Sequence, residues 1–350
     1  MIFTGKGDGN FEIINKYDTK KPFRIKRRQV QNLASNTNGA DYLIIYNNIF
    51  ADQAEQLRSH RASFDNYRSV KSEIEDIYDI FNYGMENPVA IKNYVNYIYN
   101  NWQSPKLKYV CLFGRGSTDP KKNNPSAFYY QNFVPVYGNP TSDGYFVNMN
   151  SATFTYYQQI AIGRLPAYTV QEAQDMVNKI INYDANFYDV WTKKFVFITG
   201  GFNAAEQKSF MDESDYLINS YVLPPPIAGF PIRIYRRDTT SGQITYGYQD
   251  SIKNSINNGS LIVNYIGHAS SATWDNGLEN PAILQNGNKL PLIMSMTCFT
   301  GRNAETDFLS GRGFGEIFIT LPSKGSIGFI GTTGWSFEYY GNVYNGYLFQ

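Results

Sequence analysis

A thiol and an imidazole each follow a strongly apolar run in this chain, and both residue types are rare in it. The 350 residues include two histidines and two cysteines. His268 closes the run SLIVNYIGHAS, and Cys298 closes LPLIMSMTCFTG. A cysteine attacks a carbonyl carbon as the thiolate, and a neighbouring histidine can protonate the amine that leaves. The pair therefore predicts a cysteine nucleophile assisted by a histidine.

Both runs are predicted to be buried strands that lie side by side in one sheet. They are continuously apolar instead of alternating, which is typical of strands covered on both faces. His268 and Cys298 are thirty positions apart, about one strand–helix–strand step. Because open α/β sheets hold their active sites at the carboxyl ends of their strands, we expect the two side chains to meet there.

The other cysteine and histidine are interpreted as structural. Cys111 lies inside the apolar run YVCLF and is expected to be a core residue, whereas His60, in the charged segment QLRSHRAS, is expected on an exposed helix. Free cysteine is often buried for packing alone, so this alternative also stays open for Cys298. Against it, Cys298 is followed by a polar turn that begins at Thr300.

Strand-length apolar runs recur from Tyr42 onward, with helical segments between them. The expected strands are Tyr42–Tyr46, Tyr109–Phe113, Phe195–Thr199, Leu261–Ile266, Leu292–Met296 and Ile327–Ile330. The expected helices are Pro88–Trp102, Thr169–Tyr183 with a capping box at Thr169 and Glu172, Phe210–Tyr221, and Phe314–Leu321. This alternation predicts an α/β fold of mostly parallel sheets flanked by helices.

The length favours one large α/β unit or two coupled ones. We expect an N-terminal β segment, or the remnant of a preceding domain, over residues 1–38. A first α/β subdomain is expected over 39–190, and a second, carrying Cys298 and His268, over 191–350. Neither a signal peptide at the start nor a cap at the end is recognisable, and the sequence leaves open both whether the chain is a fragment and whether it is secreted.

Composition excludes several classes of protein. With 31 basic and 30 acidic residues, a broad nucleic-acid-binding face is not expected. No apolar stretch reaches the roughly 18 residues of a membrane helix. There is no CxxC or HxxxH pair, so structural zinc is not expected. No cofactor is predicted, and nothing in the sequence indicates structural calcium.

The segments IVNYIGHAS and MSMTCFTG resemble the His and Cys motifs of the gingipain family of cysteine peptidases, in the caspase-like clan. LKYVCLFGRGSTDPK, VPVYGNPTSDGYF and IAIGRLPAYTVQEAQDMVNKIINY resemble the branch that contains PorU, the sortase-like peptidase of type IX secretion. The resemblance runs from about residue 41 to the end. It implies a caspase-like fold of two coupled subdomains and a cysteine endopeptidase acting on a polypeptide.

By this resemblance, Cys298 is the nucleophile and His268 the general acid and base. The backbone amides of Cys298 and Ala269 form the oxyanion hole, although the family usually has glycine after the histidine. Trp335 is implied in the wall of the substrate pocket. Each role is an implication of the family's pattern.

A third catalytic residue is not where the family often keeps it. An acid commonly precedes the IGR motif, and here that position is Gln159. Either the histidine acts without a carboxylate, or another acid such as Asp143 orients it. Arg115 likewise stands where the PorU branch tends to have an acid.

The resemblance implies a bacterial cell surface, outer membrane or extracellular setting. Its implied partners are a polypeptide substrate and other type IX secretion components. Release of the acyl group by water would make the protein a protease, and release by an amine a transpeptidase. Two alternatives stay open: a catalytically weak binding or structural member of the family, and a thiol acyltransferase acting on small molecules.

Overall fold

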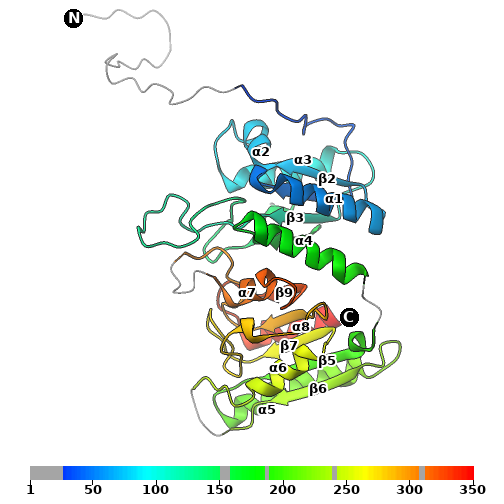
Figure 1. Cartoon of the computed structure of the whole chain (residues 1–350), viewed down its shortest axis with the longest axis vertical. Helices are drawn as coiled ribbons and strands as arrows, with labels where there is room; N and C mark the ends of the chain where they lie inside the picture. Colours follow the sequence, from blue (N-terminus) through cyan, green and yellow to red (C-terminus); the bar gives the residue numbers. More distant parts are fainter. Residues whose placement is uncertain (1–26, 150–157, 186–188, 239–242, 307–311) are drawn as a thin grey trace, which may run out of the picture. The chain divides into compact units, whose positions relative to one another are not determined.

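The computed structural model describes residues 27–149, 158–185, 189–238, 243–306 and 312–350. Residues 32–350 form one compact unit, and residues 1–31 are grouped apart from it. Most of the expected N-terminal β segment lies outside the described residues, and residues 27–38 are loops and turns. The folded unit is traced in Figure 1.

Two parallel sheets form the centre of this unit. The first has the order β2-β1-β3-β4 and the second β6-β5-β7-β8-β9. The strands are β1 (Tyr42–Tyr46), β2 (Ser69–Glu73), β3 (Tyr109–Phe113), β4 (Ala161–Leu165), β5 (Lys194–Thr199), β6 (Phe230–Tyr235), β7 (Ile262–Ile266), β8 (Leu292–Met296) and β9 (Gly328–Gly331). The expected α/β fold of parallel sheets is confirmed.

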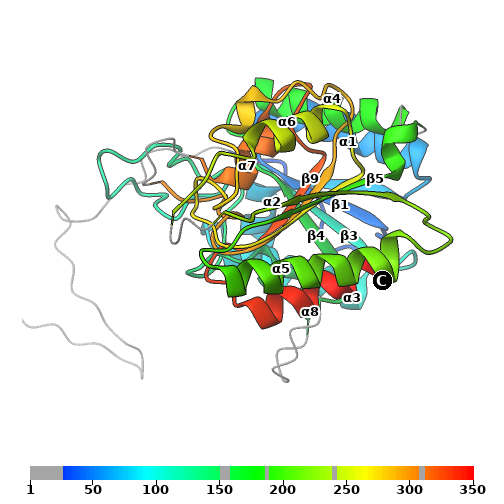
Figure 2. The same cartoon turned by 90° about the horizontal axis from the view of Figure 1, so that it is seen from below.

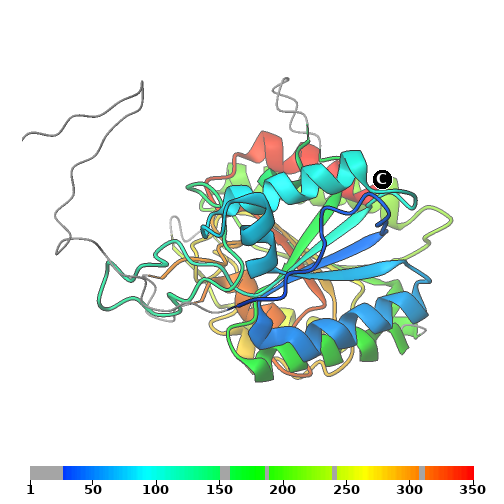
Figure 3. The ribbon, with the colours of Figure 1, turned by 90° about the horizontal axis from the view of Figure 1, so that it is seen from above.

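Helices cover both faces of each sheet (Figures 2 and 3). They are α1 (Ala51–Phe64), α2 (Ile74–Phe81), α3 (Pro88–Asn101), α4 (Val170–Ala185), α5 (Ala204–Leu217), α6 (Gln249–Asn257), α7 (Phe314–Thr320) and α8 (Glu338–Phe349). Short helical turns span Asn48–Phe50, Asp143–Val147, Val190–Lys193, Ile218–Val222 and Pro281–Ile283. The first sheet packs between α2 with α3 and α1 with α4, and the second between α5 with α8 and α6 with α7.

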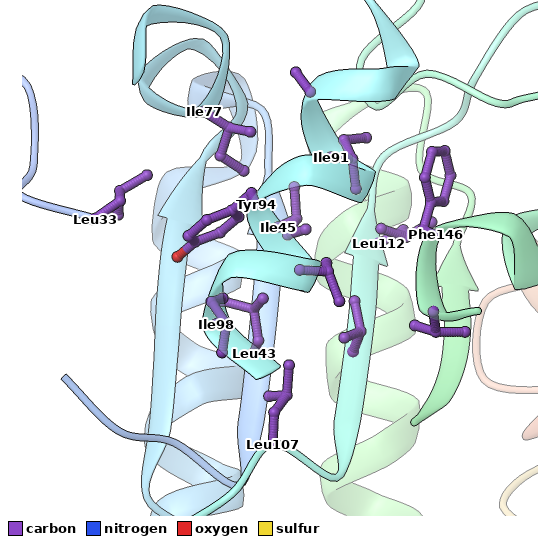
Figure 4. Packing of buried hydrophobic residues seen from close by; sticks show 14 of the residues in the cluster. Leu33, Leu43, Ile45, Ile77, Ile91, Tyr94, Ile98, Leu107, Leu112 and Phe146 are labelled. Carbon is purple, nitrogen blue, oxygen red and sulfur yellow. The ribbon is translucent and has the colours of Figure 1, made fainter. Parts of the chain in front are cut away.

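The helices begin where local chemistry favours it. Asn87 caps α3 by accepting the amide of Val89, and Pro88 occupies the first turn, where a missing N–H costs nothing. In the expected capping box of α4, the amide of Glu172 donates to the Thr169 hydroxyl at 3.2 Å. One apolar face of α3, with Ile91, then covers the first sheet, as Figure 4 shows.

Three strands, each at an edge of its sheet, went unpredicted because their sequences carry charge or proline, whereas the apolar edge strand β9 was expected as Ile327–Ile330. β2 has the sequence SVKSE, β4 is AIGRL and β6 is FPIRIY. An edge strand tolerates charge and proline on its unpaired side, so it lacks the continuous apolar run that marks a central strand. The interior strands have that run and were found.

Buried ion pairs and hydrogen bonds connect the loop after β3 and helix α4 with helix α7. Arg115, just after β3, donates to Glu316 of α7 at 2.7 Å, and both side chains are fully buried. Arg312 contacts Glu316 at 3.2 Å and Glu172 of α4 at 2.7 Å. Lys179 of α4 donates to the carbonyls at the end of α7, including that of Ile319 at 3.0 Å. The residue that departs from the PorU branch, Arg115, therefore has a structural partner.

No helix among the described residues is long and apolar enough to cross a membrane.

The Glu316→Gln variant tests the buried charge network. It leaves Arg115 buried without its anion, and breaking such a pair costs about 3 kcal/mol of unfolding free energy. Urea denaturation measures the loss. Glu279→Gln, at an exposed carboxylate, is the control, and an equally small loss in both variants would contradict the assignment.

Candidate active site

The parallel register of β7 and β8 brings His268 and Cys298 together. The last paired residues are Ile266 and Met296, so each reactive residue lies two positions past its strand. Beyond the strands, the Thr297 hydroxyl donates to the Gly267 carbonyl at 2.7 Å. His268 and Cys298 line the same cavity of about 120 Å³. The expected meeting at the carboxyl edge of the sheet is therefore observed.

Gly267 is required by close packing beneath the histidine. A Cβ at this position would collide with the Tyr265 hydroxyl and would lie 2.9 Å from the backbone of Gly200. The chain can pass over β5 here only without a side chain. The glycine thus sets how the backbone presents His268.

The Cys298 thiol is half-buried and faces the loop that follows β9. The amide of Ser336 donates to its sulfur at 3.2 Å, and the Ser336 carbonyl lies 3.4 Å from the same atom. The backbone of Ser336 therefore both donates to the sulfur and accepts from its S–H, and it fixes the Cys298 side chain against this loop.

A strained residue follows the thiol. Phe299 has φ 61°, in the left-handed region that residues other than glycine rarely occupy. Its amide donates to the Gly334 carbonyl at 2.9 Å. Its ring packs on Trp335, with centroids 4.7 Å apart, and lies 4.6 Å from the Arg302 guanidinium. These contacts hold the sharp turn on which Cys298 sits.

His268 is held by a carboxylate and an aromatic ring. Its Nε2 lies 3.0 Å from Oε2 of Glu206, and its ring stacks on Phe202 at 4.3 Å. The side chain keeps 40% exposure. Since Nε2 is engaged, Nδ1 is the nitrogen left for proton transfer.

Glu206 belongs to the first turn of α5, where it also accepts the amide of Phe202 at 2.8 Å. Burial raises the pKa of this carboxyl, but the Phe202 amide and His268 outweigh burial, and the pKa lies below its ordinary value. A carboxylate that stays ionised can fix the tautomer and orientation of the imidazole.

Sequence reasoning missed Glu206 although a signal was present. Asn203 and Glu206 form an N-x-x-E pair just after the strand FVFITGG, and Asn203 does cap α5. That strand, β5, pairs directly with β7. A capping glutamate at the carboxyl end of the neighbouring strand was thus the acid nearest the histidine.

The other candidate acid lies elsewhere. Asp143 forms a two-bond ion pair with Arg164, at 2.7 and 2.8 Å. Gln159 accepts the amide of Met149 at 2.8 Å. The carboxylate that the structure places on His268 is that of Glu206, so Asp143 is not what orients the ring.

Buried polar groups support the backbone of His268. The Tyr265 hydroxyl lies 2.6 Å from the His268 carbonyl and also contacts the Asp275 carboxyl. Asp275 accepts the amide of Gly201 at 2.8 Å, and its own amide donates to the His268 carbonyl at 2.9 Å. Burial raises the pKa of Asp275. The group ties the His268 turn to the loop that carries Phe202 and Glu206.

The backbone amides of Ala269 and Cys298 follow the two strands directly. Ala269 faces Trp274 in an isolated antiparallel β-bridge. The backbone hydrogen bonds of this bridge are donated by the amides of Ser270 and Asp275, not by that of Ala269. Within the described residues, neither the Ala269 amide nor the Cys298 amide donates to a protein acceptor. Ala269 also lies outside the left-handed region, so the alanine introduces no strain there.

The other residues singled out in the sequence lie in different parts of the structure. Trp335 is 76% exposed and packs against Phe299. It lines, with Asp143, a larger cleft of about 610 Å³. Cys111 is buried as expected. His60 is helical but pairs with Asp184 at 2.7 Å and is only 14% exposed, so the expectation of an exposed residue was wrong.

In the described part of the chain, no group of three or more His, Cys, Asp or Glu side chains could hold a metal ion.

The model of peptidase family C25 matches residues 35–350. Gingipain R2 of Porphyromonas gingivalis is 24% identical over 246 residues, which cover 67% of this chain and 29% of that protein. Gingipain R1 of the same species is 24% identical over 246 residues and is covered to 22%. The chain thus spans less than a third of the length of these curated relatives.

Solved structures show the same fold. The crystal structure of the Arg-specific cysteine proteinase gingipain R aligns with a TM-score of 0.63 at 19% identity, over 89% of this chain and 66% of that one. A complex of RgpB pro- and mature domains from Porphyromonas gingivalis gives 0.64 at 18% identity, over 85% and 64%. Dimeric latent PorU from that species gives 0.37 at 20% identity, over 41% and 15%, too slight a likeness to carry an argument.

Because Phe299 has a positive φ, a glycine at this position should stabilise the fold more than an alanine, which is the reverse of their order inside a helix. The left-handed conformation costs a residue with a Cβ about 1 kcal/mol, so Phe299→Gly should be more stable than Phe299→Ala by that amount. At Tyr344, inside α8, alanine should instead be more stable than glycine by up to about 1 kcal/mol. Chemical denaturation of the four variants checks the signs. The same sign at both sites would count against strain.

The pKa of Glu206 predicts how its contribution depends on pH. The folded pKa lies below the ordinary value of 4.5, so the ionised form favours the folded state. The stabilisation is complete above pH 4.5 and is lost as the pH falls through the folded pKa. The difference in unfolding midpoint between the native protein and Glu206→Gln should therefore shrink on acidification. Thermal melts at pH 7 and below pH 4 measure it, with Glu279→Gln as control.

Proposed function

The chain belongs to peptidase family C25, and on that premise we propose that it is a cysteine endopeptidase with Cys298 as nucleophile and His268 as general acid and base. The observation that carries the proposal is the juxtaposition of Cys298 and His268 at one cavity, with Glu206 on Nε2 of the imidazole. The gingipain relatives lend support at the level of the family.

Acylation begins when the Cys298 thiolate attacks the carbonyl carbon of a peptide bond. A carbon–sulfur bond forms, and the carbonyl oxygen becomes an oxyanion that accepts the amides of Ala269 and Cys298. The carbon–nitrogen bond then breaks, and Nδ1 of His268 gives its proton to the departing amine. The products are a thioester on Cys298 and a free amino terminus.

Deacylation regenerates the thiolate. Water, losing a proton to His268, attacks the thioester carbon, and the carbon–sulfur bond breaks to release the carboxylic acid. Glu206 keeps the imidazole oriented in both steps and stabilises its charged form. If an amine attacks in place of water, the outcome is a new amide bond, and the protein acts as a transpeptidase.

The finer proposal is a PorU-like role. Its support is the set of motifs from LKYVCLFGRGSTDPK to the IGR segment. On this proposal the substrates are polypeptides exported by type IX secretion, the partners are other components of that system, and the setting is the bacterial surface. Trp335, beside the turn of Cys298, is proposed to form part of the substrate-binding wall.

We also retain the proposed division into subdomains 39–190 and 191–350. The second contains Cys298 and His268, and the first supports it. The Thr118 amide donates to the Ala304 carbonyl at 2.9 Å, and the Thr333 hydroxyl donates to the Thr141 carbonyl at 2.6 Å. Loops of the first half therefore brace both loops that surround the thiol.

The rival functions differ in what they require of the thiol. The alternative of a catalytically weak family member was supported by the absence of an acid at Gln159. Glu206 provides a carboxylate for His268, so that support is removed. A small-molecule acyltransferase needs the same nucleophile but no affinity for a peptide.

Labelling with peptidyl acyloxymethyl ketones tests the proposed function. Compounds with arginine, leucine or serine next to the reactive group are compared. Cys298 should be alkylated, and Cys298→Ala should abolish both labelling and peptide cleavage. Cys111 should stay unlabelled because burial raises the pKa of its thiol to about 12.

Cys111→Ser is the matched control and should keep full activity, while His268→Ala should lower kcat by at least about 100-fold. Unchanged cleavage by Cys298→Ala would overturn the proposal. Labelling by iodoacetamide but by no peptide reagent would favour the acyltransferase.

A further inference from the structure

The outward face of α8 is aromatic although the helix is already docked on the second sheet. Its inner face is fixed by Asn345, which accepts from Asn264 of β7 at 2.7 Å, and by the ring of Phe349, stacked on Phe197. On the opposite face Tyr339 is 72% and Tyr347 68% exposed. Aromatic side chains gathered on an exposed face are typical of a binding surface.

Part of this face forms one wall of a groove. Between α5 and α8 lies a hollow of about 420 Å³ lined by Tyr216, Tyr221, Tyr339, Tyr347 and Glu213. Figure 2 shows the two helices side by side. Asn342 lines both this groove and the cavity that contains Cys298. The groove and the cavity that contains Cys298 are therefore neighbours, with Asn342 between them.

The charge in the groove is negative and uncompensated. Glu213 is half-buried and makes no ion pair within the described residues, and burial, with Glu338 nearby, raises the pKa of its carboxyl. No lysine or arginine lines the groove among the described residues, and Lys208 of α5 and Arg233 of β6 pair with Asp212 and Asp215. Tyrosine faces and a carboxylate together suit a lysine or arginine on an otherwise apolar segment.

We propose that the groove between α5 and α8 binds a segment of the polypeptide substrate, away from the bond that is cleaved, that carries a basic residue among apolar ones. The proposal rests on the proposed function, because the position of the groove next to the Cys298 cavity is what makes a polypeptide substrate its occupant. A second copy of this chain is a poorer occupant, since a two-fold contact would bring the same acidic groove against itself.

Binding to the Cys298→Ala protein tests the groove without requiring cleavage. The probes are two fluorescein-labelled hexapeptides, one alternating lysine and leucine and one alternating glutamate and leucine, measured by anisotropy. The lysine peptide should bind at least about 10-fold more tightly, a factor that corresponds to two weak cation–π contacts. Tyr339→Ala combined with Tyr347→Ala, and separately Glu213→Gln, should remove most of that difference.

Tyr340→Ala is the matched control, because Tyr340 is 70% exposed on the same helix but does not line the groove. It should leave binding unchanged, and thermal melts establish that each variant is folded. Equal affinity for the two peptides, or equal loss in Tyr340→Ala, would overturn the proposal. A concentration-dependent dimer abolished by the Tyr339 and Tyr347 changes would assign the groove to a second copy instead.

A kinetic experiment distinguishes failure of this inference from failure of the proposed function. With the unmodified protein, a quenched fluorogenic peptide is compared with versions extended at either end by the lysine–leucine segment. One extension should lower KM several-fold, and Glu213→Gln should cancel that gain while leaving the short peptide's kcat/KM unchanged. If no peptide is cleaved, the proposed function fails, while the anisotropy experiment still decides whether the groove binds.

Discussion

The register of β7 against β8 is the constraint on which the site depends. Both strands run parallel and advance equally, so the residues just beyond Ile266 and Met296 emerge side by side. A slip of one residue would turn every side chain of one strand to the other face and would send the thiol into the helix layer. Buried apolar residues on both faces make that slip costly. The same contacts that stabilise the sheet thus align the reactive pair.

Fine positioning is achieved by loops rather than strands. The turn of Cys298 is held in a left-handed conformation by the loop after β9, and the turn of His268 rests on Tyr265 and Asp275. Loops can take backbone angles that a strand cannot, and the sheet beneath gives them a rigid base. The stiff sheet therefore sets where the two chains emerge, and the turns beyond it set how His268 and Cys298 face the cavity that both line.

The sequence allowed the central strands and the reactive pair to be predicted because both leave local signals. Strands such as Leu292–Met296 are covered on two faces and read as unbroken apolar runs, whereas edge strands such as Ser69–Glu73 do not. Glu206 was missed because its local pattern is fully explained by helix capping. Its contact with His268, sixty-two residues away, exists because β5 lies next to β7 in the sheet. The order of strands in a sheet cannot be predicted from any short segment of the sequence.

The bracing of the thiol by Ser336 and by the first half has a consequence for biosynthesis. A ribosome delivers the first sheet early, then the histidine, then the cysteine, and last the loop that contacts the sulfur. Until residue 336 has emerged and folded back, the Cys298 thiol lacks its neighbouring amide and the turn at Phe299 lacks its support. The surroundings of the thiol are therefore completed only late in the synthesis of this unit, after both sheets' central strands have been made.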